Sequence, residues 1–279
     1  MNAIFRVPLR DGAELEIYRF ILKGKQTDLP DWVLPFAQYN LPACWGEYYA
    51  DLWKGRHENC CDYLYIGRVG GIPCGRMWFG YSLRTGAGNF GNVLTLPEYR
   101  RRGIMKILLN RCVSDFYGSG ALFCSCDAAA SAAPAYAAAG FRRIFSETQP
   151  PMVIVSKRIT DFAAIMEMAY GRTESAVVRE GTVCDRFDCD KLLGYAPEVY
   201  GRIAQHPVFP GYLNLWGWSR KNHVPIYVLE AVSGFCAGYA VSCGDSPFIF
   251  LHPAFERYRD SMLCRIRTMT RVCKSSPPC

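Results

Sequence analysis

The residues around Gly103 carry the clearest chemical signal in this sequence. This glycine stands where a helical pattern of apolar residues begins, and four basic residues surround it: Arg100, Arg101, Arg102 and Lys106. The first turn of a helix leaves backbone N–H groups unpaired, its dipole favours negative charge, and a glycine lets an anion approach closely. Arginine also binds phosphate oxygens through two parallel hydrogen bonds. The segment predicts a cradle for a diphosphate, and a solvated basic helix start is the alternative that the charges leave open.

Two common phosphate-containing ligands, ATP and NAD, do not fit this segment. It lacks the Lys-[Ser/Thr] pair of nucleoside triphosphatase loops and the three glycines of a dinucleotide fingerprint. What it does contain is Pro97-x-Tyr99 followed by Arg100-x-x-Gly103-x-Met105. This pattern resembles the GNAT superfamily of N-acetyltransferases, in which a small residue is usual at the position of Met105. The resemblance implies that the turn binds the pyrophosphate of acetyl-CoA or of another acyl-CoA.

A second block, ending at Gly140-Phe141, resembles the same superfamily. It reads Ala133-Pro134-Ala135-Tyr136-x-x-x-Gly140-Phe141. The resemblance implies that Tyr136 protonates the departing coenzyme A thiolate, and a phenol with an ordinary pKa of about 10 keeps its proton at neutral pH. The alternative is a tyrosine that only packs on an alanine-rich helix. The asparagine that the family often has seven residues earlier is Ala129 here, which leaves Ser131 as the nearest polar substitute.

The chemistry that the resemblance implies, direct attack of an amine on the thioester, also needs hydrogen-bond donors and a base. A backbone N–H of the strand Val93-Leu94-Thr95 is expected to stabilise the oxyanion, with the pantetheine alongside that strand. Asp127 is the leading candidate for the base, and a helix N-cap ahead of the alanine run explains this aspartate at least as well. The expected catalytic residues are therefore Tyr136 and Asp127. The expected cofactor-binding residues are Val93, Leu94, Thr95, Arg100, Arg101, Arg102, Gly103, Ile104, Met105, Lys106 and Ser131.

Strands and helices that alternate along the chain must position these residues, so the sequence predicts an α/β fold. The resemblance implies a mixed, mostly antiparallel sheet flanked by helices. Strand-like runs at 62–69 and 75–81 flank a Gly-Gly turn, which predicts a hairpin. A glycine-rich loop is expected at 84–91, and three prolines predict short helices within 28–53. Further strands are expected at 14–20, 92–95, 121–126, 141–145 and 152–155, and further helices at 101–117 and 128–139.

The second half of the sequence echoes the first. Strand-like runs at 226–232 and 238–241 flank another glycine turn, and a proline and an aromatic, Pro253 and Phe255, again precede a helical stretch. These matches favour an internal duplication, and chance likeness of two α/β segments is the alternative.

The corresponding turn of the second half has lost the features of a phosphate cradle. Arg259 stands in place of the glycine, and Glu256 stands in place of the first arginine. A side chain at the turn and a negative charge beside it both disfavour a diphosphate. We therefore expect a GNAT-like acyl-CoA-binding catalytic domain at residues 1–158 and a degenerate GNAT-like domain at residues 159–279.

Composition limits the remaining function classes. Half of the 279 residues are hydrophobic and 20% are charged, which suits a folded chain with a sizeable core. The net charge of +7 fits a phosphorylated ligand at least as well as nucleic acid, and no apolar run approaches the ~18 residues of a membrane span. The 14 cysteines are scattered without zinc-ligand spacing, so no metal is expected. A secretory start is absent, which favours a cytoplasmic protein.

We therefore expect an acetyl-CoA-dependent N-acetyltransferase that modifies a small-molecule or peptide amine, without nucleic-acid or membrane partners. Two alternatives stay open. One is a transferase for longer acyl chains, which the motifs do not distinguish from an acetyltransferase. The other is a non-catalytic acyl-CoA-binding or sensing protein, suggested by the missing asparagine and the uncertain base.

Overall fold

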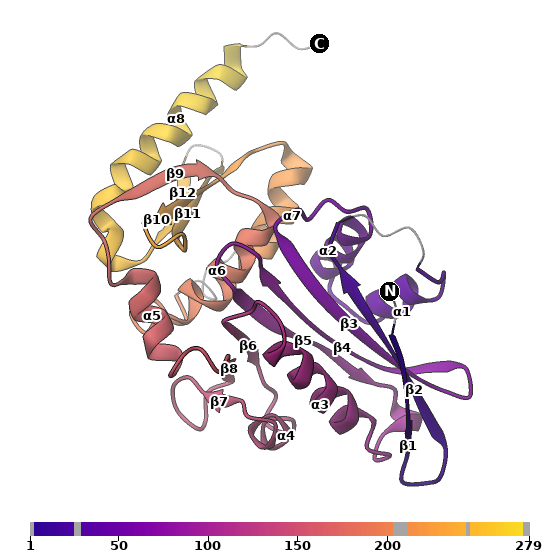
Figure 1. Ribbon diagram of the computed structural model, residues 1–279. Coiled ribbons are helices and arrows are strands. Elements are labelled where there is room, and N and C mark those ends of the chain that lie inside the picture. Colours follow the sequence, from indigo (N-terminus) through magenta and orange to yellow (C-terminus); the bar gives the residue numbers. More distant parts are fainter. Residues whose placement is uncertain (1–2, 25–28, 203–210, 244–245, 276–279) are drawn as a thin grey trace. The chain divides into compact units, whose positions relative to one another are not determined.

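The computed structural model describes residues 3–24, 29–202, 211–243 and 246–275 (Figure 1). The chain divides into two compact units, Met1–Thr160 and Asp161–Cys279, and each contains its own sheet. Within the described ranges, no helix is both long enough and apolar enough to cross a membrane.

An eight-stranded sheet forms the N-terminal unit. Its strands lie in the order β1-β2-β3-β4-β5-β6-β8-β7. Strands β5 and β6 run parallel, whereas the other neighbours pair antiparallel. This architecture confirms the expected mixed, mostly antiparallel sheet. The strands are β1 (Ala3–Pro8), β2 (Glu14–Leu22), β3 (Cys60–Val69), β4 (Ile72–Ser82), β5 (Ala87–Thr95), β6 (Phe123–Asp127), β7 (Arg142–Arg143) and β8 (Pro151–Val155).

The hairpin between β3 and β4 turns on two glycines. Val69 pairs with Ile72 across the turn, and Gly70 and Gly71 have φ angles of 57° and 81°. A two-residue turn with two positive φ angles matches the twist of the flanking strands, and glycine adopts that conformation without steric cost. The prediction of a hairpin at this place is confirmed.

Helix α3 (Ile104–Tyr117) covers one face of this sheet. Its buried residues Ile104, Leu108 and Cys112 lie in one apolar core with residues of the sheet. Gly75 of β4 marks the close approach, because a Cβ there would lie 3.0 Å from Ile104 Cγ2 and 3.3 Å from the Leu94 carbonyl. Each fully buried aliphatic side chain stabilises the fold by about 1.5–3 kcal/mol, so packing fixes where the first turn of α3 lies.

Helices α1 (Val33–Gln38) and α2 (Ala43–Trp53) cover the opposite face, as the strand alternation shows. Trp78 of β4 packs edge-on against Trp45 of α2, with ring centroids 5.2 Å apart. Its neighbour Met77 belongs to the core that contains the α3 residues. Because successive strand residues point to opposite faces, these two neighbours identify the two helix layers. The expectation of short helices in this region is confirmed.

The C-terminal unit contains a four-stranded antiparallel sheet in the order β12-β11-β10-β9. Two short 3₁₀ turns aside, its elements after α5 follow in the order β9, α6, α7, β10, β11, β12, η4, α8. The first unit has the same order from β2 to α3, which is the order that a duplication predicts. The elements are α5 (Phe162–Tyr170), β9 (Ala176–Glu180), α6 (Arg186–Lys191), α7 (Tyr212–Asn222), β10 (Ile226–Ala231), β11 (Cys236–Cys243), β12 (Ser246–Leu251), η4 (Pro253–Tyr258) and α8 (Arg259–Ser275).

Some elements differ from the expected ones. The loop expected at 84–91 is already strand from Ala87 onward, because Gly88 lets β5 approach β6: a Cβ at Gly88 would lie 2.6 Å from Cys124 Sγ. The alanine-rich helix α4 spans only Ala133–Ala138, and the strand expected at 141–145 is reduced to β7. Sequence analysis also missed the edge strands β1 and β9.

Candidate active site

The parallel strands β5 and β6 pair over only three positions and then part. The pairing runs from Ala87 opposite Phe123 to Asn89 opposite Ser125. At the last pair, the buried Asn89 side chain donates from Nδ2 to the Ser125 carbonyl at 2.9 Å and to the Phe90 carbonyl at 3.0 Å. The remaining length of β5, from Phe90 on, pairs with β4 alone among the described strands. One edge of β5 therefore offers backbone groups beside the point of parting.

A bulge redirects β5 immediately after this point. The register with β4 shifts between Arg76 and Trp78, and Asn92 has a φ of 53°. The buried Arg76 holds the bulge, since its Nε donates to the Asn92 carbonyl at 3.2 Å and its Nη1 donates to the Phe36 carbonyl of α1 at 2.9 Å. Asn92 Nδ2 donates to the Tyr49 hydroxyl of α2 at 3.0 Å. Both helices of the opposite face thus fix the course of β5.

Beyond the bulge lie the three residues expected to bind the pantetheine, and all three are half-buried: Val93, Leu94 and Thr95. Leu94 pairs with Arg76 of β4, and the Leu96 N–H donates to the Cys74 carbonyl at 2.9 Å. Backbone groups alternate in direction along a strand, so the N–H groups of Val93 and Thr95 face away from β4. The Thr95 carbonyl on that side accepts a hydrogen bond from Arg100 Nε at 3.2 Å.

The turn after β5 leaves the N-terminus of α3 accessible. A 3₁₀ turn (Pro97–Tyr99) precedes it, and two residues are left-handed, Arg101 with a φ of 64° and Gly103 with a φ of 92°. The Gly103 carbonyl accepts from Ile107 N–H at 3.1 Å, so the N–H groups of Ile104, Met105 and Lys106 precede the helical ladder. A Cβ at Gly103 would find one atom within 4 Å, Arg10 Nε at 4.0 Å. Backbone donors thus lie at an unobstructed turn, the arrangement that binds anions.

The basic side chains of the turn differ in what they contact. Arg102 Nε pairs with Asp11 Oδ2 at 2.6 Å, and its guanidinium lies 5.5 Å from the centroid of the Tyr99 ring. This pair holds the pKa of the Asp11 carboxyl below its usual value. Arg101 and Lys106 are exposed. The four cations expected around the anion therefore differ, because Arg102 is paired with an internal carboxylate whereas Arg101 and Lys106 extend into solvent.

Tyr136 lies on α4 and belongs to the same apolar core as Ile104 of α3. Its ring packs against Phe90, the first residue of β5 after the parting, with centroids 5.4 Å apart and planes at 84°. Gly140, with a φ of 102°, ends the helix, and the Phe141 N–H donates to the Tyr136 carbonyl at 3.0 Å. The Gly-Phe pair thereby closes a Schellman turn that holds the tyrosine.

The environment of the Tyr136 phenol keeps its proton in place. Burial raises the pKa of Tyr136 well above its ordinary value, and the nearby Cys126 and Cys112 raise it further. Within the described part of the chain, no group forms a hydrogen bond with its hydroxyl, which therefore has its proton available for a ligand.

Asp127 and Ser131 lie between β6 and α4. Asp127 is the exposed last residue of β6, opposite Pro151 of β8. Helix α4 begins at Ala133 with Ala132 as its N-cap, so the alternative explanation of Asp127 as a helix N-cap is wrong. The alanines after the aspartate form a turn before they form a helix, and Ser131 is exposed in that turn.

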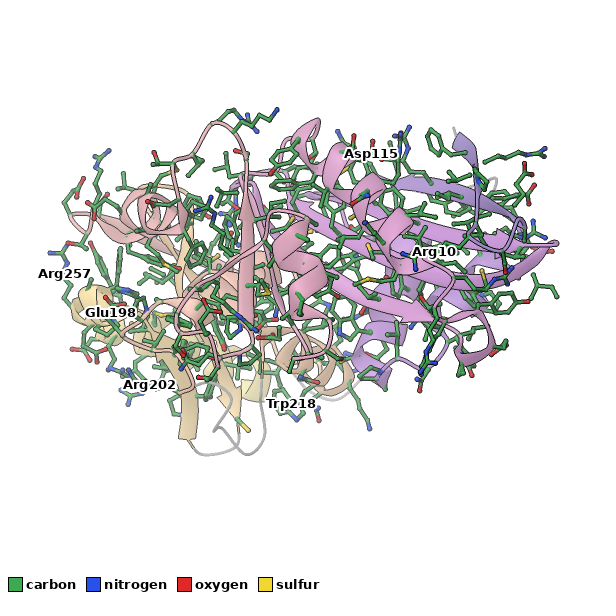
Figure 2. All side chains as sticks on the ribbon, turned by 90° about the horizontal axis from the view of Figure 1, so that it is seen from below. Arg10, Asp115, Glu198, Arg202, Trp218 and Arg257 are labelled. Carbon is green, nitrogen blue, oxygen red and sulfur yellow. The ribbon has the colours of Figure 1, made fainter. Side chains whose placement is uncertain are left out.

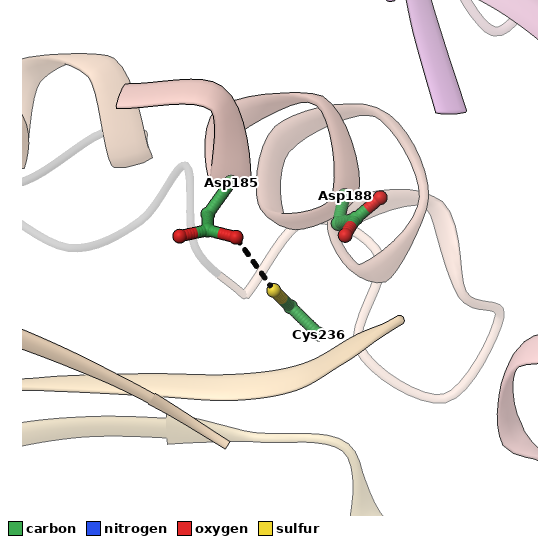
Figure 3. Close-up of side chains that lie close together, drawn as sticks. All are labelled: Asp185, Asp188 and Cys236. Atoms are coloured by element: carbon green, nitrogen blue, oxygen red, sulfur yellow. Dashed lines mark hydrogen bonds between the residues drawn. The ribbon is translucent and has the colours of Figure 1, made fainter. Parts of the chain in front are cut away.

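Two other places in the chain contain side chains of reactive or metal-binding types, Cys124 in β6 and a cluster in the C-terminal unit. Cys124 is fully buried in β6, and burial raises the pKa of its thiol well above the ordinary value, which removes it as a nucleophile. In the C-terminal unit, Asp185, Asp188 and Cys236 lie close enough to hold a metal ion (Figure 3). Asp185, however, accepts hydrogen bonds from Arg179 at 2.6 and 2.9 Å and from the Thr182 N–H at 2.7 Å. Its oxygens are already occupied, so we assign no metal site there.

Sequence reasoning missed the residues that shape this site from a distance. Arg10 and Asp11 belong to the β1–β2 turn, and β1 itself was not predicted. Arg76 and Asn92 look like ordinary strand residues in the sequence. Their roles depend on a bulge and on contacts with α1 and α2, and no local pattern records these.

Comparisons with known proteins bear on this region. Residues 27–141 match the profile of the acetyltransferase (GNAT) family, a range that includes β5, the Gly103 turn and Tyr136. No curated protein matches the sequence significantly.

Two of the solved structures that resemble the chain match about half of it. GCN5 from Tetrahymena is 14% identical with a TM-score of 0.37, over 51% of this chain and 98% of that chain. A GNAT family acetyltransferase from Brucella melitensis, in complex with acetyl-CoA, is 17% identical with a TM-score of 0.35. This match covers 49% of this chain and 87% of that chain. Likenesses at this level say nothing about substrate. The profile match shows that residues 27–141, all within the N-terminal unit, are similar to the acetyltransferase (GNAT) family.

Proposed function

We propose that the N-terminal unit transfers an acetyl group from acetyl-CoA to the amine of a small molecule or peptide. One observation carries the proposal. The left-handed Gly103 leaves the N-terminus of α3 unobstructed beside the parted strands β5 and β6, and Tyr136 packs on Phe90 at the point of parting. The range that matches the family, residues 27–141, includes all of these elements, and this supports acyl transfer as the reaction that they catalyse together.

The pyrophosphate of the coenzyme binds at the turn in this proposal. The N–H groups of Ile104, Met105 and Lys106 supply backbone donors, and the helix dipole adds to their effect. Met105, where the family usually has a small residue, is half-buried and packs against the core, so its side chain does not block the Gly103 turn. The pantetheine follows the free edge of β5 at Val93 and Thr95.

Transfer proceeds by direct attack. The amine nitrogen bonds to the thioester carbonyl carbon, and the carbonyl oxygen becomes an oxyanion that a β5 N–H group stabilises. When the carbon–sulfur bond breaks, the electron pair stays on sulfur, and Tyr136 gives its proton to the thiolate. Because burial raises the pKa of Tyr136, the phenol carries a proton at neutral pH that it can share with the departing sulfur.

The attacking amine must lose a proton, and we assign its acceptance to Asp127, directly or through water. Asp127 ends β6 on the side where β5 has parted from it, and its side chain is exposed. A carboxylate at this place can serve as the general base that accepts the proton.

The C-terminal unit is proposed to be a degenerate copy without a coenzyme site. Its 3₁₀ turn η4 passes directly into α8 at Arg259, which is right-handed with a φ of −55°, so a counterpart of the Gly103 conformation is missing there. Arg259 is also paired with Glu256. Both features favour a stable helix start over an anion cradle.

Titration calorimetry and an activity assay together test the proposal. Acetyl-CoA should bind the purified protein, and Gly103→Trp should abolish that binding. Thiol release should then be followed over a panel of polyamines, amino acids and peptides, with Tyr136→Phe expected to lower turnover by about 10²-fold or more. Absence of acetyl-CoA binding would refute the proposal, whereas binding without transfer to any amine would favour an acyl-CoA sensor. Tighter binding of longer acyl-CoAs would shift it to longer-chain transfer.

A further inference from the structure

We propose that Arg10, in the turn between β1 and β2, binds the diphosphate of the coenzyme across the Gly103 turn. This inference rests on the function proposed above and adds a recognition element far from the sequence motif. Arg10 takes the place beside the anion that the sequence pattern suggests for Arg102.

The β1–β2 turn is well ordered by its own hydrogen bonds. The Leu9 N–H donates to the Ala13 carbonyl at 2.8 Å, and the Gly12 N–H donates to the Leu9 carbonyl at 3.1 Å. Gly12 is left-handed with a φ of 83°, and Asp11 Oδ1 accepts from the Ala13 N–H at 3.2 Å. The backbone at Arg10 is therefore held in one conformation at the tip of the hairpin.

An ion pair ties this turn to the turn before α3. Asp11 Oδ2 lies 2.6 Å from Arg102 Nε. The Arg102 side chain is only 22% exposed, so the protein partly shields this ion pair from water. The carboxylate neutralises Arg102 and brings the neighbouring Arg10 to the mouth of the cradle. Figure 2 shows Arg10 near the start of α3, with Asp115 near the other end of that helix.

The Arg10 side chain has the properties that an anion needs. Its Nε is the nearest described atom to the Cβ position of Gly103, at 4.0 Å, so the guanidinium lies beside the turn at which the coenzyme is proposed to bind. Among the described residues, no carboxylate lies within ion-pair distance of Arg10, and the side chain is exposed. The cation is therefore neither neutralised nor buried before a ligand arrives.

The ligand class follows from this juxtaposition. The backbone N–H groups at the start of α3 and the Arg10 guanidinium are two sets of donors beside the same glycine. A diphosphate presents oxygens in two directions and carries at least two negative charges, so it can accept from both sets at once. The 3′-phosphate of coenzyme A shares this chemistry, and the experiment must separate the two sources.

Calorimetric titration of Arg10→Ala with three ligands makes this separation. Acetyl-CoA contains both phosphate groups, 3′-dephospho-acetyl-CoA contains only the diphosphate, and S-acetylpantetheine contains neither. The variant should bind the first two at least about tenfold more weakly than the unaltered protein, by similar factors, as expected for a charge-assisted hydrogen bond. Its affinity for S-acetylpantetheine should not change. Arg10→Lys should recover part of the loss, since it keeps the charge without the bidentate geometry.

Arg6→Ala is the matched control. Arg6 is an exposed arginine of the adjoining strand β1 whose partners are Glu14 and Glu16, so its removal should leave coenzyme affinity unchanged. If Arg10→Ala binds acetyl-CoA within twofold of the unaltered protein while Gly103→Trp does not bind, the role of Arg10 is overturned and the proposed function stands. A loss confined to acetyl-CoA would overturn the diphosphate assignment in favour of the 3′-phosphate. Failure of the unaltered protein to bind acetyl-CoA would overturn both.

Discussion

Replacing Gly103 by alanine separates the role of this glycine in folding from its role in binding. The φ of 92° is a conformation that costs an L-residue with a Cβ about 1–2 kcal/mol. No steric clash adds to this cost, because the nearest atom to the new Cβ is Arg10 Nε at 4.0 Å. The free energy of unfolding should therefore fall by about 1–2 kcal/mol, which most domains tolerate.

The effect on coenzyme binding should be larger than the effect on stability. The new methyl group occupies the side of the turn from which the diphosphate reaches the N–H groups of α3. A hydrogen bond to a charged group contributes about 1.5–3 kcal/mol, so loss of one such bond weakens the Kd for acetyl-CoA by about 10- to 150-fold.

Gly234→Ala supplies the comparison. Gly234 is left-handed with a φ of 85°, has no atom within 4 Å of its Cβ position, and lies in the C-terminal unit. Both variants should lose similar stability in chemical denaturation, and only Gly103→Ala should lose affinity in calorimetry. Equal affinity of the two variants for acetyl-CoA would refute the reasoning that the Gly103 turn holds the diphosphate.

Three further predictions concern the N-terminal unit and the number of coenzyme sites in the chain. Tyr136→Phe should lower kcat without changing the Kd for acetyl-CoA. Because burial raises the pKa of this phenol, the part of the rate that depends on Tyr136 should not decline with rising pH below about pH 10. A decline at lower pH would contradict the role of Tyr136 as the acid. Gly75→Ala should lower the free energy of unfolding by about 1–3 kcal/mol through overpacking against α3, whereas Gly91→Ala, which meets no atom within 4 Å, should cost less than half as much in the same denaturation experiment. Titration with acetyl-CoA should give one site per chain, since Arg259 closes the corresponding turn of the C-terminal unit, and two sites would contradict that assignment.

The segments with strong local patterns are those that the sequence predicts well. The Gly70-Gly71 turn and the apolar period of α3 each encode their structure in neighbouring residues, and both are present as expected. The left-handed glycine directly before α3 is likewise where the sequence predicts it, although the left-handed Arg101 in the same turn was not predicted.

Long-range features explain what the sequence could not predict. Gly88 reads as a loop residue, yet its lack of a side chain lets β5 lie against Cys124 of β6. The ion pair between Asp11 and Arg102 joins two distant segments, so a basic run that looks uniform contains cations of different kinds. The position of Asp127 before a turn and not at a helix start follows from the chain's return toward β8, which no period in the sequence records.

A crystal structure of the chain with coenzyme A bound is the decisive measurement. We expect diphosphate oxygens within hydrogen-bond distance of the Ile104 and Met105 N–H groups, with the thiol beside the Tyr136 hydroxyl. A coenzyme bound elsewhere on the chain, or a thiol on the far side of the sheet from Tyr136, would contradict this expectation.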